Sequence, residues 1–516
     1  MADNSNNKTI AKNTLFLYFR MMFTMAIHLY TSRVILQVLG VDDFGIYQAV
    51  GGVVGMITFL NAALAVGTSR FLTFELGTGN FEKLKRTFST VLTAHVILAI
   101  IIVVISETIG LWFVYNKLML PPERLGAAVI AYHFSVLTVV AQLLLVPYNA
   151  SIISHERMGI YAYASIVDAM LSLLIVYFLT IGDVDKLVLY AGLFLCVKVG
   201  MTIFYAFYCV RRFVETRCKL IMDKIILREV LGYSGWNLLS NGAIALNNQG
   251  ALILLNMFFG PGVVAGRAIA NQVNMAAFHF ITNFRTASNP QIVKRYAAKD
   301  YVGSKELLLS STKYSFYLML MLALPIVLVA ESLLKIWLGQ IPPYSVVFLQ
   351  LAIVTSLFQV FDTSFYTALY AKGQIRENAI ISPMVGFLAF PIMFLLFKLG
   401  FSPESMAWVS MVGVALLGLI IKPFLIIKIV EYTWKDIFSV FFPCLKVTLA
   451  SLPVPIMSYF ILQGSEMFLN FTLLVIVSVL SVLLSIWFLG INASQQESLM
   501  KIINQKMSRC VFLHNT

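Results

Sequence analysis

Apolar segments long enough to cross a bilayer follow one another from Asn13 to Ile491. A membrane-spanning helix needs roughly 20 such residues, and we count about fourteen segments of this kind. Backbone groups in lipid must bond to each other, so spanning segments are helices or closed barrels. The apolar runs are long rather than short and alternating, which excludes a barrel. The sequence therefore predicts an all-α polytopic membrane protein.

Composition and charge agree with this class. Of 516 residues, 59% are hydrophobic and 12% are charged, whereas soluble domains carry about 25% charged residues. The net charge of +13 is explained by topology rather than by a nucleic-acid partner, because Lys and Arg collect in cytoplasmic loops. With a cytoplasmic N-terminus, about 23 Lys and Arg lie on the inner side and about 5 on the outer side. We expect both termini to be cytoplasmic.

The hydropathy pattern predicts where the helices lie. Their ranges are 14–39, 44–74, 87–114, 125–152, 158–181, 187–210, 231–258, 262–289, 308–331, 344–371, 377–397, 405–427, 438–463 and 467–491.

The chain also repeats itself at an offset of about 220 residues, far longer than a solenoid repeat. Gly40 closes the first predicted helix and Gly260 the seventh, and the loop around Phe81 falls on the loop around Tyr301. An even number of helices in each half makes the halves parallel, an arrangement in which transporters bind substrate between the halves. We predict two parallel six-helix bundles and two extra C-terminal helices. The predicted parts are an N-terminal lobe (1–210), a cytoplasmic linker (211–230), a C-terminal lobe (231–430), two further helices (431–491) and a cytoplasmic tail (492–516).

Polar side chains form stripes on a few of these helices, recurring at three- and four-residue spacing that places them on one face. The predicted site residues are Arg20 and His28 on the first helix, Arg70 at the end of the second, Asn237, Asn241 and Asn248 on the seventh, and Arg267, Asn271, Asn274 and Arg285 on the eighth.

Two interpretations of the stripes stay open. The amides join neighbouring helices by hydrogen bonds, with the arginines reaching the interface on their long stems. Alternatively, the stripes line a water-filled cavity between the halves, which the number of polar groups per helix favours. A cavity rich in arginine attracts an anion, and guanidinium groups suit phosphate. The amides suit hydroxyl-rich sugars.

Three carboxylates, Glu107, Asp168 and Asp362, also lie inside predicted helices, as does Lys198. Each carboxylate is either one partner of a structural ion pair, which we favour, or a proton or sodium site. The five cysteines form no CxxC or Cys/His cluster, so no metal site is expected. No phosphate loop, nucleophile elbow or helical zinc signature is present, so neither an enzyme nor a cofactor is predicted.

Short motifs resemble the polysaccharide branch of the multidrug/oligosaccharidyl-lipid/polysaccharide exporter superfamily. The stretch Leu39–Tyr47 (LGVDDFGIY) is similar to a motif between the first two helices of that branch. Ser69-Arg70-Phe71 and Ser234-Gly235-Trp236-Asn237 also resemble it. The resemblance covers nearly the whole chain and agrees with the predicted architecture.

The resemblance implies a Wzx-type flippase in the bacterial inner membrane. Such proteins move undecaprenyl-diphosphate-linked oligosaccharides, the repeat units of O-antigen or capsule, to the periplasmic leaflet. It also implies polysaccharide polymerase or glycosyltransferase partners. We expect contact with membrane lipids and, by default, a monomer. The alternatives are a lipid II flippase, a multidrug cation antiporter and, from a different class, a membrane-embedded glycosyltransferase or polymerase, which the short loops at Lys117–Arg124 and Glu331–Tyr344 disfavour. The antiporter typically has a carboxylate in the first helix, and this first helix has none.

Overall fold

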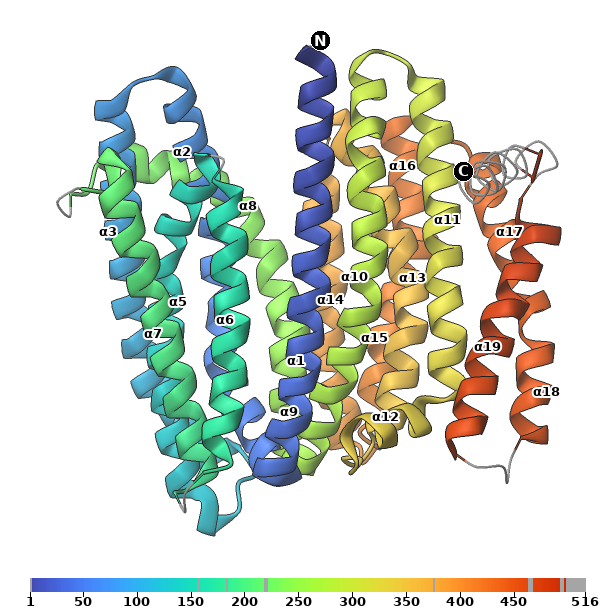
Figure 1. Cartoon of the computed structure of the whole chain (residues 1–516), viewed down its shortest axis with the longest axis horizontal. Helices are drawn as coiled ribbons and strands as arrows, with labels where there is room; N and C mark the ends of the chain where they lie inside the picture. The colour runs from blue at the N-terminus through green and yellow to red at the C-terminus, as the bar shows by residue number, and fades with distance from the viewer. Residues whose placement is uncertain are drawn as a thin grey trace, which may run out of the picture. The chain divides into compact units, whose positions relative to one another are not determined.

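The structure is a computed structural model, and it describes residues 2–155, 157–181, 184–217, 221–374, 376–462, 467–491 and 496–497. Helices account for most of this part of the chain, and no strand occurs among the described residues (Figure 1). The predicted cytoplasmic tail, 492–516, lies almost wholly outside the described residues. Because the described part of the chain is mostly helix and contains no strand, the all-α prediction is confirmed.

Each of the fourteen predicted segments lies on helix. The helices of the first part are α1 (Ala2–Gly55), α2 (Phe59–Thr78), α3 (Phe81–Ile105), α4 (Leu111–Lys117), α5 (Leu125–Ser154), α6 (Met158–Leu179), α7 (Lys186–Arg212), α8 (Lys224–Ala245) and α9 (Ala251–Phe259). Those that follow are α10 (Pro261–Ala297), α11 (Tyr301–Leu328), α12 (Ala330–Leu338), α13 (Ser345–Lys372), α14 (Arg376–Lys398), α15 (Ser405–Leu416), α16 (Lys422–Val430), α17 (Trp434–Ser451), α18 (Pro453–Ile461) and α19 (Met467–Ser485).

Twelve helical segments in the described part are long and apolar enough to cross a membrane. One of them, Met22–Thr58, joins the end of the first predicted helix to the start of the second. α10 is long enough but is not among the twelve, because its polar residues lower its hydropathy. The chain is a multi-pass membrane protein.

Two glycines break the chain at equivalent places in the two halves. Gly40 interrupts α1 with φ 78° and ψ 173°, and Gly260 ends α9 with φ 82° and ψ −179°. L-residues rarely adopt such positive φ values, whereas glycine does so at little cost. Both glycines therefore end a helix and let the next one begin in a new direction, as the repeat predicted.

The helix starts keep the same register. α3 begins at Phe81 after the N-cap Asn80, whose side chain accepts a hydrogen bond from the Lys83 backbone N–H. α11 begins at Tyr301 after the N-cap Asp300, which accepts from the Gly303 N–H. Such caps satisfy backbone donors that a helix start leaves unpaired. The offset of about 220 residues thus holds for element boundaries as well as for hydropathy.

The chain forms two compact units. Unit 1 comprises residues 1–272, 337–345 and 379–409, and unit 2 comprises residues 273–336, 346–378 and 410–516. This division follows spatial packing and passes through α10. The lobe boundaries derived from the repeat stay a prediction.

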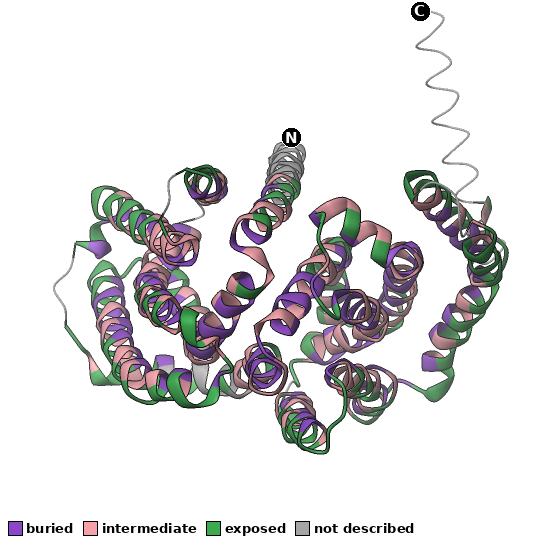
Figure 2. Ribbon diagram, turned by 90° about the horizontal axis from the view of Figure 1, so that it is seen from below, coloured by how far each residue is buried: buried purple, intermediate pink, exposed green. Residues whose placement is uncertain are grey.

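Exposed residues recur along most of the described helices (Figure 2), and many of them are large and apolar. Ile225, Ile461 and Phe488 are each more than 70% exposed. A soluble protein rarely exposes contiguous apolar surface on this scale. Apolar surface of this extent suits a multi-pass membrane protein, whose spanning helices face lipid.

Candidate functional site

An ion pair lies between α6 and α7 in unit 1. Lys198 Nζ donates to both carboxylate oxygens of Asp168, at 2.7 Å and 2.9 Å. Its ammonium also lies 5.1 Å from the centre of the Phe194 ring. His28 is exposed on α1 and interacts electrostatically with both members of the pair. One predicted coupling carboxylate and one predicted binding residue therefore share a polar region of unit 1.

Arg70 is exposed near the end of α2 and lines an open pocket of about 740 Å³. The other lining residues are Ala65, Ser69, Thr73 and Phe74. The Thr73 hydroxyl is held by contacts with the Ser69 carbonyl and the Ser154 hydroxyl. The pocket thus combines one guanidinium group with hydroxyl groups and apolar walls. Guanidinium groups bind phosphate through paired N–H donors.

The polar stripe of the seventh predicted helix (231–258) runs from α8 into a π-helical turn, Leu246–Gly250, that precedes α9. Asn241 is half-buried and Asn248 is exposed. The neighbouring Asn247, which the sequence pattern did not single out, donates to the Gly386 carbonyl on α14 at 3.0 Å. A π-turn adds a residue to the helical turn and shifts the faces that follow. A regular 3.6-residue period cannot anticipate this change.

The eighth-helix stripe follows α10 through both units. Arg267 and Asn271 are half-buried in unit 1. In unit 2, Asn274 accepts a hydrogen bond from the Ser356 hydroxyl on α13 at 2.7 Å. This part of the stripe therefore bonds a neighbouring helix, as in the packing interpretation.

Arg285 makes similar contacts further along α10. It is 7% exposed, and its Nη2 donates to the Thr363 carbonyl at 2.5 Å and to the Thr367 hydroxyl at 2.9 Å. The two remaining candidates, Arg20 and Asn237, lie on α1 and α8, but their side chains are outside the described residues.

The other two intramembrane carboxylates also have basic neighbours. His133 Nδ1 lies 3.0 Å from Glu107 Oε1, and Lys422 Nζ lies 3.3 Å from Asp362 Oδ1. Sequence reasoning did not name His133 or Lys422 as partners, although each is a basic residue within a predicted apolar helix. No group of three or more His, Cys, Asp or Glu side chains in the described part of the chain could hold a metal ion.

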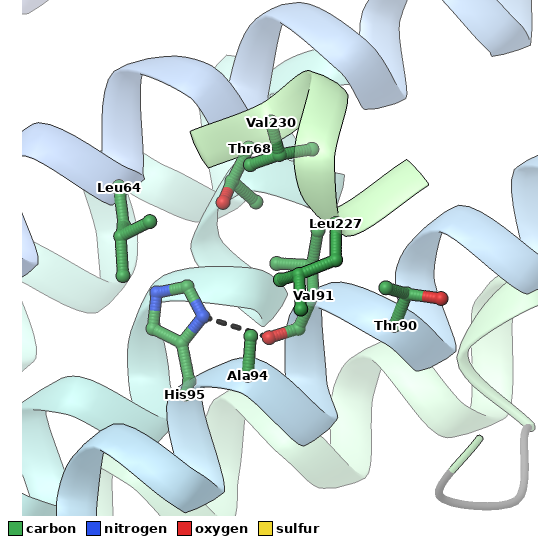
Figure 3. A pocket seen from close by; sticks show the side chains of 8 residues that line it. All are labelled: Leu64, Thr68, Thr90, Val91, Ala94, His95, Leu227 and Val230. Atoms are coloured by element: carbon green, nitrogen blue, oxygen red, sulfur yellow. Dashed lines mark hydrogen bonds between the residues drawn. The ribbon is translucent and has the colours of Figure 1, made fainter. Parts of the chain in front are cut away.

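A small enclosed cavity lies between α2, α3 and α8 (Figure 3). His95 is 1% exposed, and its Nδ1 lies 2.8 Å from the Val91 carbonyl. Its Nε2 and the hydroxyl of the fully buried Thr68 have no hydrogen-bond partner in the structure. Both side chains line the cavity together with apolar residues. Sequence reasoning missed this pair because nothing in the pattern sets it apart from ordinary core positions.

Arg124, at the start of α5, joins Asp43 on α1 to Asp185 at the start of α7 within unit 1. It donates to both carboxylate oxygens of Asp43, at 2.8 Å and 2.5 Å, and to both oxygens of Asp185, at 2.6 Å and 3.1 Å. Its hydrogen bonds hold the pKa of the Asp185 carboxyl below its ordinary value. Asp43 belongs to the LGVDDFGIY stretch, so part of that motif serves to fix unit 1 at this end.

No protein-family model matches the sequence, and no curated protein matches it. Solved structures do match. The lipid II flippase MurJ in an inward closed conformation is 12% identical, with a TM-score of 0.65, and the match covers 91% of this chain and 97% of that one. An inward-facing multidrug resistance MATE family transporter of the MOP superfamily is 16% identical, with a TM-score of 0.65, and the match covers 80% of this chain and 99% of that one.

A third structure is a MOP superfamily transporter from Pyrococcus furiosus, whose reversed binding-pocket polarity is taken to suggest a different function. It is 17% identical, with a TM-score of 0.55, and the match covers 82% of this chain and 97% of that one. These comparisons show that the chain has the fold of the MurJ flippase and of MATE transporters.

Proposed function

We propose that this protein is a flippase of the MOP superfamily. Its substrate is an undecaprenyl-diphosphate-linked oligosaccharide, an O-antigen or capsule repeat unit. It moves the sugar head group from the cytoplasmic to the periplasmic leaflet of the bacterial inner membrane by alternating access. Both termini are cytoplasmic in this proposal.

The observation that carries the proposal is the open pocket at Arg70. Arg70 is exposed and borders this pocket, and guanidinium groups bind phosphate through paired N–H donors. Beside it the Ser69 and Thr73 positions add polarity, while Ala65 and Phe74 supply apolar wall. We infer that Arg70 receives the diphosphate.

The charges elsewhere support an anionic substrate over a cationic drug. The first predicted helix, 14–39, has no acidic residue. Asp168 is bound through both oxygens by Lys198, and Asp362 lies beside Lys422. A cationic drug would compete poorly for carboxylates that already have a basic partner.

A lipid II flippase is the second candidate, and one observation favours it. The MurJ structure matches 91% of this chain, whereas the inward-facing MATE structure matches 80% and the Pyrococcus furiosus MOP superfamily transporter matches 82%. Lipid II and the proposed substrate both present a diphosphate, so a pocket with one arginine does not distinguish them.

Complementation tests the proposal. The chain is expressed in a bacterium that lacks its own O-unit flippase but has the cognate sugar-assembly enzymes, and surface polysaccharide is measured. We expect restoration by the wild type and loss in Arg70→Ala at equal membrane levels, with partial activity in Arg70→Lys. Arg157→Ala is the matched control, because Arg157 is exposed and lies outside the pocket.

Two further arms separate the alternatives. The first is growth of a strain depleted of its lipid II flippase, and the second is drug sensitivity of an efflux-deficient strain. If lipid-linked sugar accumulates without export while the inserted protein restores growth of the depleted strain, the substrate is lipid II. If only drug resistance appears, the flippase proposal is wrong.

A further inference from the structure

The ammonium of Lys198 contacts both a carboxylate and an aromatic ring. Two contacts go to the two Asp168 oxygens, at 2.7 Å and 2.9 Å. The Phe194 ring, whose centre is 5.1 Å from Nζ, provides a cation–π contact. The two side chains are 18% and 25% exposed. Both carboxylate oxygens of Asp168 are thus bound by one cation, the Lys198 ammonium, which belongs to the chain itself.

The hydroxyl groups of the neighbouring residues Thr202 and Ser172 donate to backbone carbonyls rather than to the Asp168 carboxylate. Thr202 donates to the Ala141 and Lys198 carbonyls, and Ser172 donates to the Asp168 backbone carbonyl. The pair therefore needs no other donor to neutralise the carboxylate. A carboxylate inside a membrane protein requires a counter-charge or a proton, because an isolated charge is expensive there.

The second half contains a related arrangement. Lys422 Nζ lies 3.3 Å from an oxygen of Asp362 and 5.3 Å from the centre of the Tyr366 ring. At the repeat offset, Lys198 corresponds to Gly418, about one helical turn before Lys422. The sixth predicted helix of each half thus supplies a lysine that contacts an aspartate and an aromatic ring, but the two aspartates, on α6 and α13, are not at equivalent positions. The second pair is looser, because Lys422 also donates to Asn378.

We propose that Lys198 is a tethered cation, which occupies at Asp168 the place that a free coupling cation would otherwise take. The transport cycle therefore takes up no free monovalent cation at this carboxylate. Deleting the lysine head group uncovers a latent site for a small monovalent cation such as sodium or methylammonium. The inference deepens the proposed function by defining how the same carrier is coupled. Its test does not use transport.

The test measures the thermal unfolding of the purified full-length protein in detergent. Sodium chloride, methylammonium chloride and choline chloride are compared at equal ionic strength, with choline as a cation too large for the site. Wild-type Tm is expected to be the same in all three. In Lys198→Ala, a cation that binds only the folded state raises Tm with concentration, and we expect a rise of about 2 °C or more.

Three variants control for unspecific effects. Lys198→Arg keeps a tethered cation and should not respond. The double variant Lys198→Ala with Asp168→Asn removes the carboxylate and should not respond either. Lys313→Ala removes a lysine that lies 5.4 Å from a tyrosine ring centre but pairs with no carboxylate among the described residues. It should not respond.

A sodium-dependent Tm in the wild type that Asp168→Asn abolishes would overturn the proposal. A folded Lys198→Ala protein that shows no preference for sodium or methylammonium over choline would do so too. If Lys198→Ala does not insert into the membrane, Lys198→Gln is measured in the same way. If neither variant inserts, even with methylammonium in the growth medium, that result also counts against the proposal. None of these results depends on polysaccharide export, so a failed complementation leaves them standing.

Discussion

A Cβ atom placed on Gly45 would lie 1.9 Å from the carbonyl oxygen of Pro261. Gly45 follows the break at Gly40, and Pro261 follows the break at Gly260. The starts of two equivalent helices therefore meet within unit 1, backbone against backbone. Glycine is required at position 45 because any side chain would occupy the space of a carbonyl group.

We expect Gly45→Ala to destabilise the protein by about 1–3 kcal/mol, since the methyl group must displace backbone rather than a flexible side chain. Thermal unfolding of the purified protein measures the effect. Gly51→Ala is the matched control: Gly51 is in the same helix, and a Cβ there meets nothing within 4 Å. Alanine should be neutral or stabilising there, by up to about 1 kcal/mol. Equal effects at both positions would show that the contact with Pro261 is unimportant.

The ion pairs of Arg124 with Asp43 and Asp185 predict that the stability of the fold depends on pH. Because Arg124 depresses the pKa of Asp185, this carboxylate stabilises the fold above its unfolded pKa of about 3.9, and the contribution is lost as pH falls through the lower folded value. Arg124→Gln should lower stability at pH 7 by about 1–2 kcal/mol, a range that allows for partial exposure of the pair.

The check is a series of Tm measurements from pH 7 to pH 3. The difference between the wild type and Arg124→Gln should stay constant down to about pH 4 and shrink below it. Arg157→Gln, an exposed arginine, should show no such difference. A gap that stays unchanged down to pH 3 would mean that Asp185 does not contribute through its charge.

The sequence predicted the helices well, but it placed several of their starts too late. The third and ninth predicted helices begin at residues 87 and 308, whereas α3 begins at Phe81 and α11 at Tyr301. Hydropathy marks only the part of a helix that lies in lipid. The first turns are polar and owe their conformation to the caps Asn80 and Asp300, which an apolar window does not detect.

The candidate site was predicted less completely, because helical periodicity gives the face of a residue but not its partner. Arg285 and Arg70 belonged to one predicted set, yet Arg285 is 7% exposed while Arg70 is exposed beside a pocket. The partner of Asp362, Lys422, is 60 positions away along the chain. Such pairings depend on the packing of helices, which no single segment encodes.

The two arginines should therefore respond differently to substitution. Arg70→Ala should reduce polysaccharide export at least about 10-fold, equivalent to about 1.4 kcal/mol, with little change in stability. Arg285→Ala should lower stability as well, by about 1–3 kcal/mol, because it leaves the carbonyl of Thr363 and the hydroxyl of Thr367 without their donor.

Export and Tm are measured on the same preparations. Thr367→Val is a milder test of the Arg285 contact and should cost less stability than Arg285→Ala. If Arg70→Ala unfolds the protein as readily as Arg285→Ala does, then Arg70 serves packing, and the pocket loses its assigned role.

The cavity beside His95 predicts one bound water molecule. The His95 Nδ1–H donates to Val91, which leaves Nε2 as an acceptor, and the Thr68 hydroxyl can donate. Figure 3 shows both side chains at the cavity. The cavity leaves about 10 Å³ for the centre of a water molecule, close to the smallest space that holds one. The surface that the cavity exposes is apolar, so a water that links α2 to α3 requires Thr68 or His95 to turn slightly toward it.

A double-mutant cycle tests this link. Thr68→Val and His95→Leu should each cost about 1–2 kcal/mol, since each leaves one polar partner unsatisfied. The double variant should cost clearly less than their sum, because the water and both polar groups are then gone. Thr138→Val is the control partner for His95→Leu: its hydroxyl bonds the carbonyl of Phe134 within α5, so those two costs should add. Additive costs for Thr68→Val and His95→Leu as well would show that no shared water joins them.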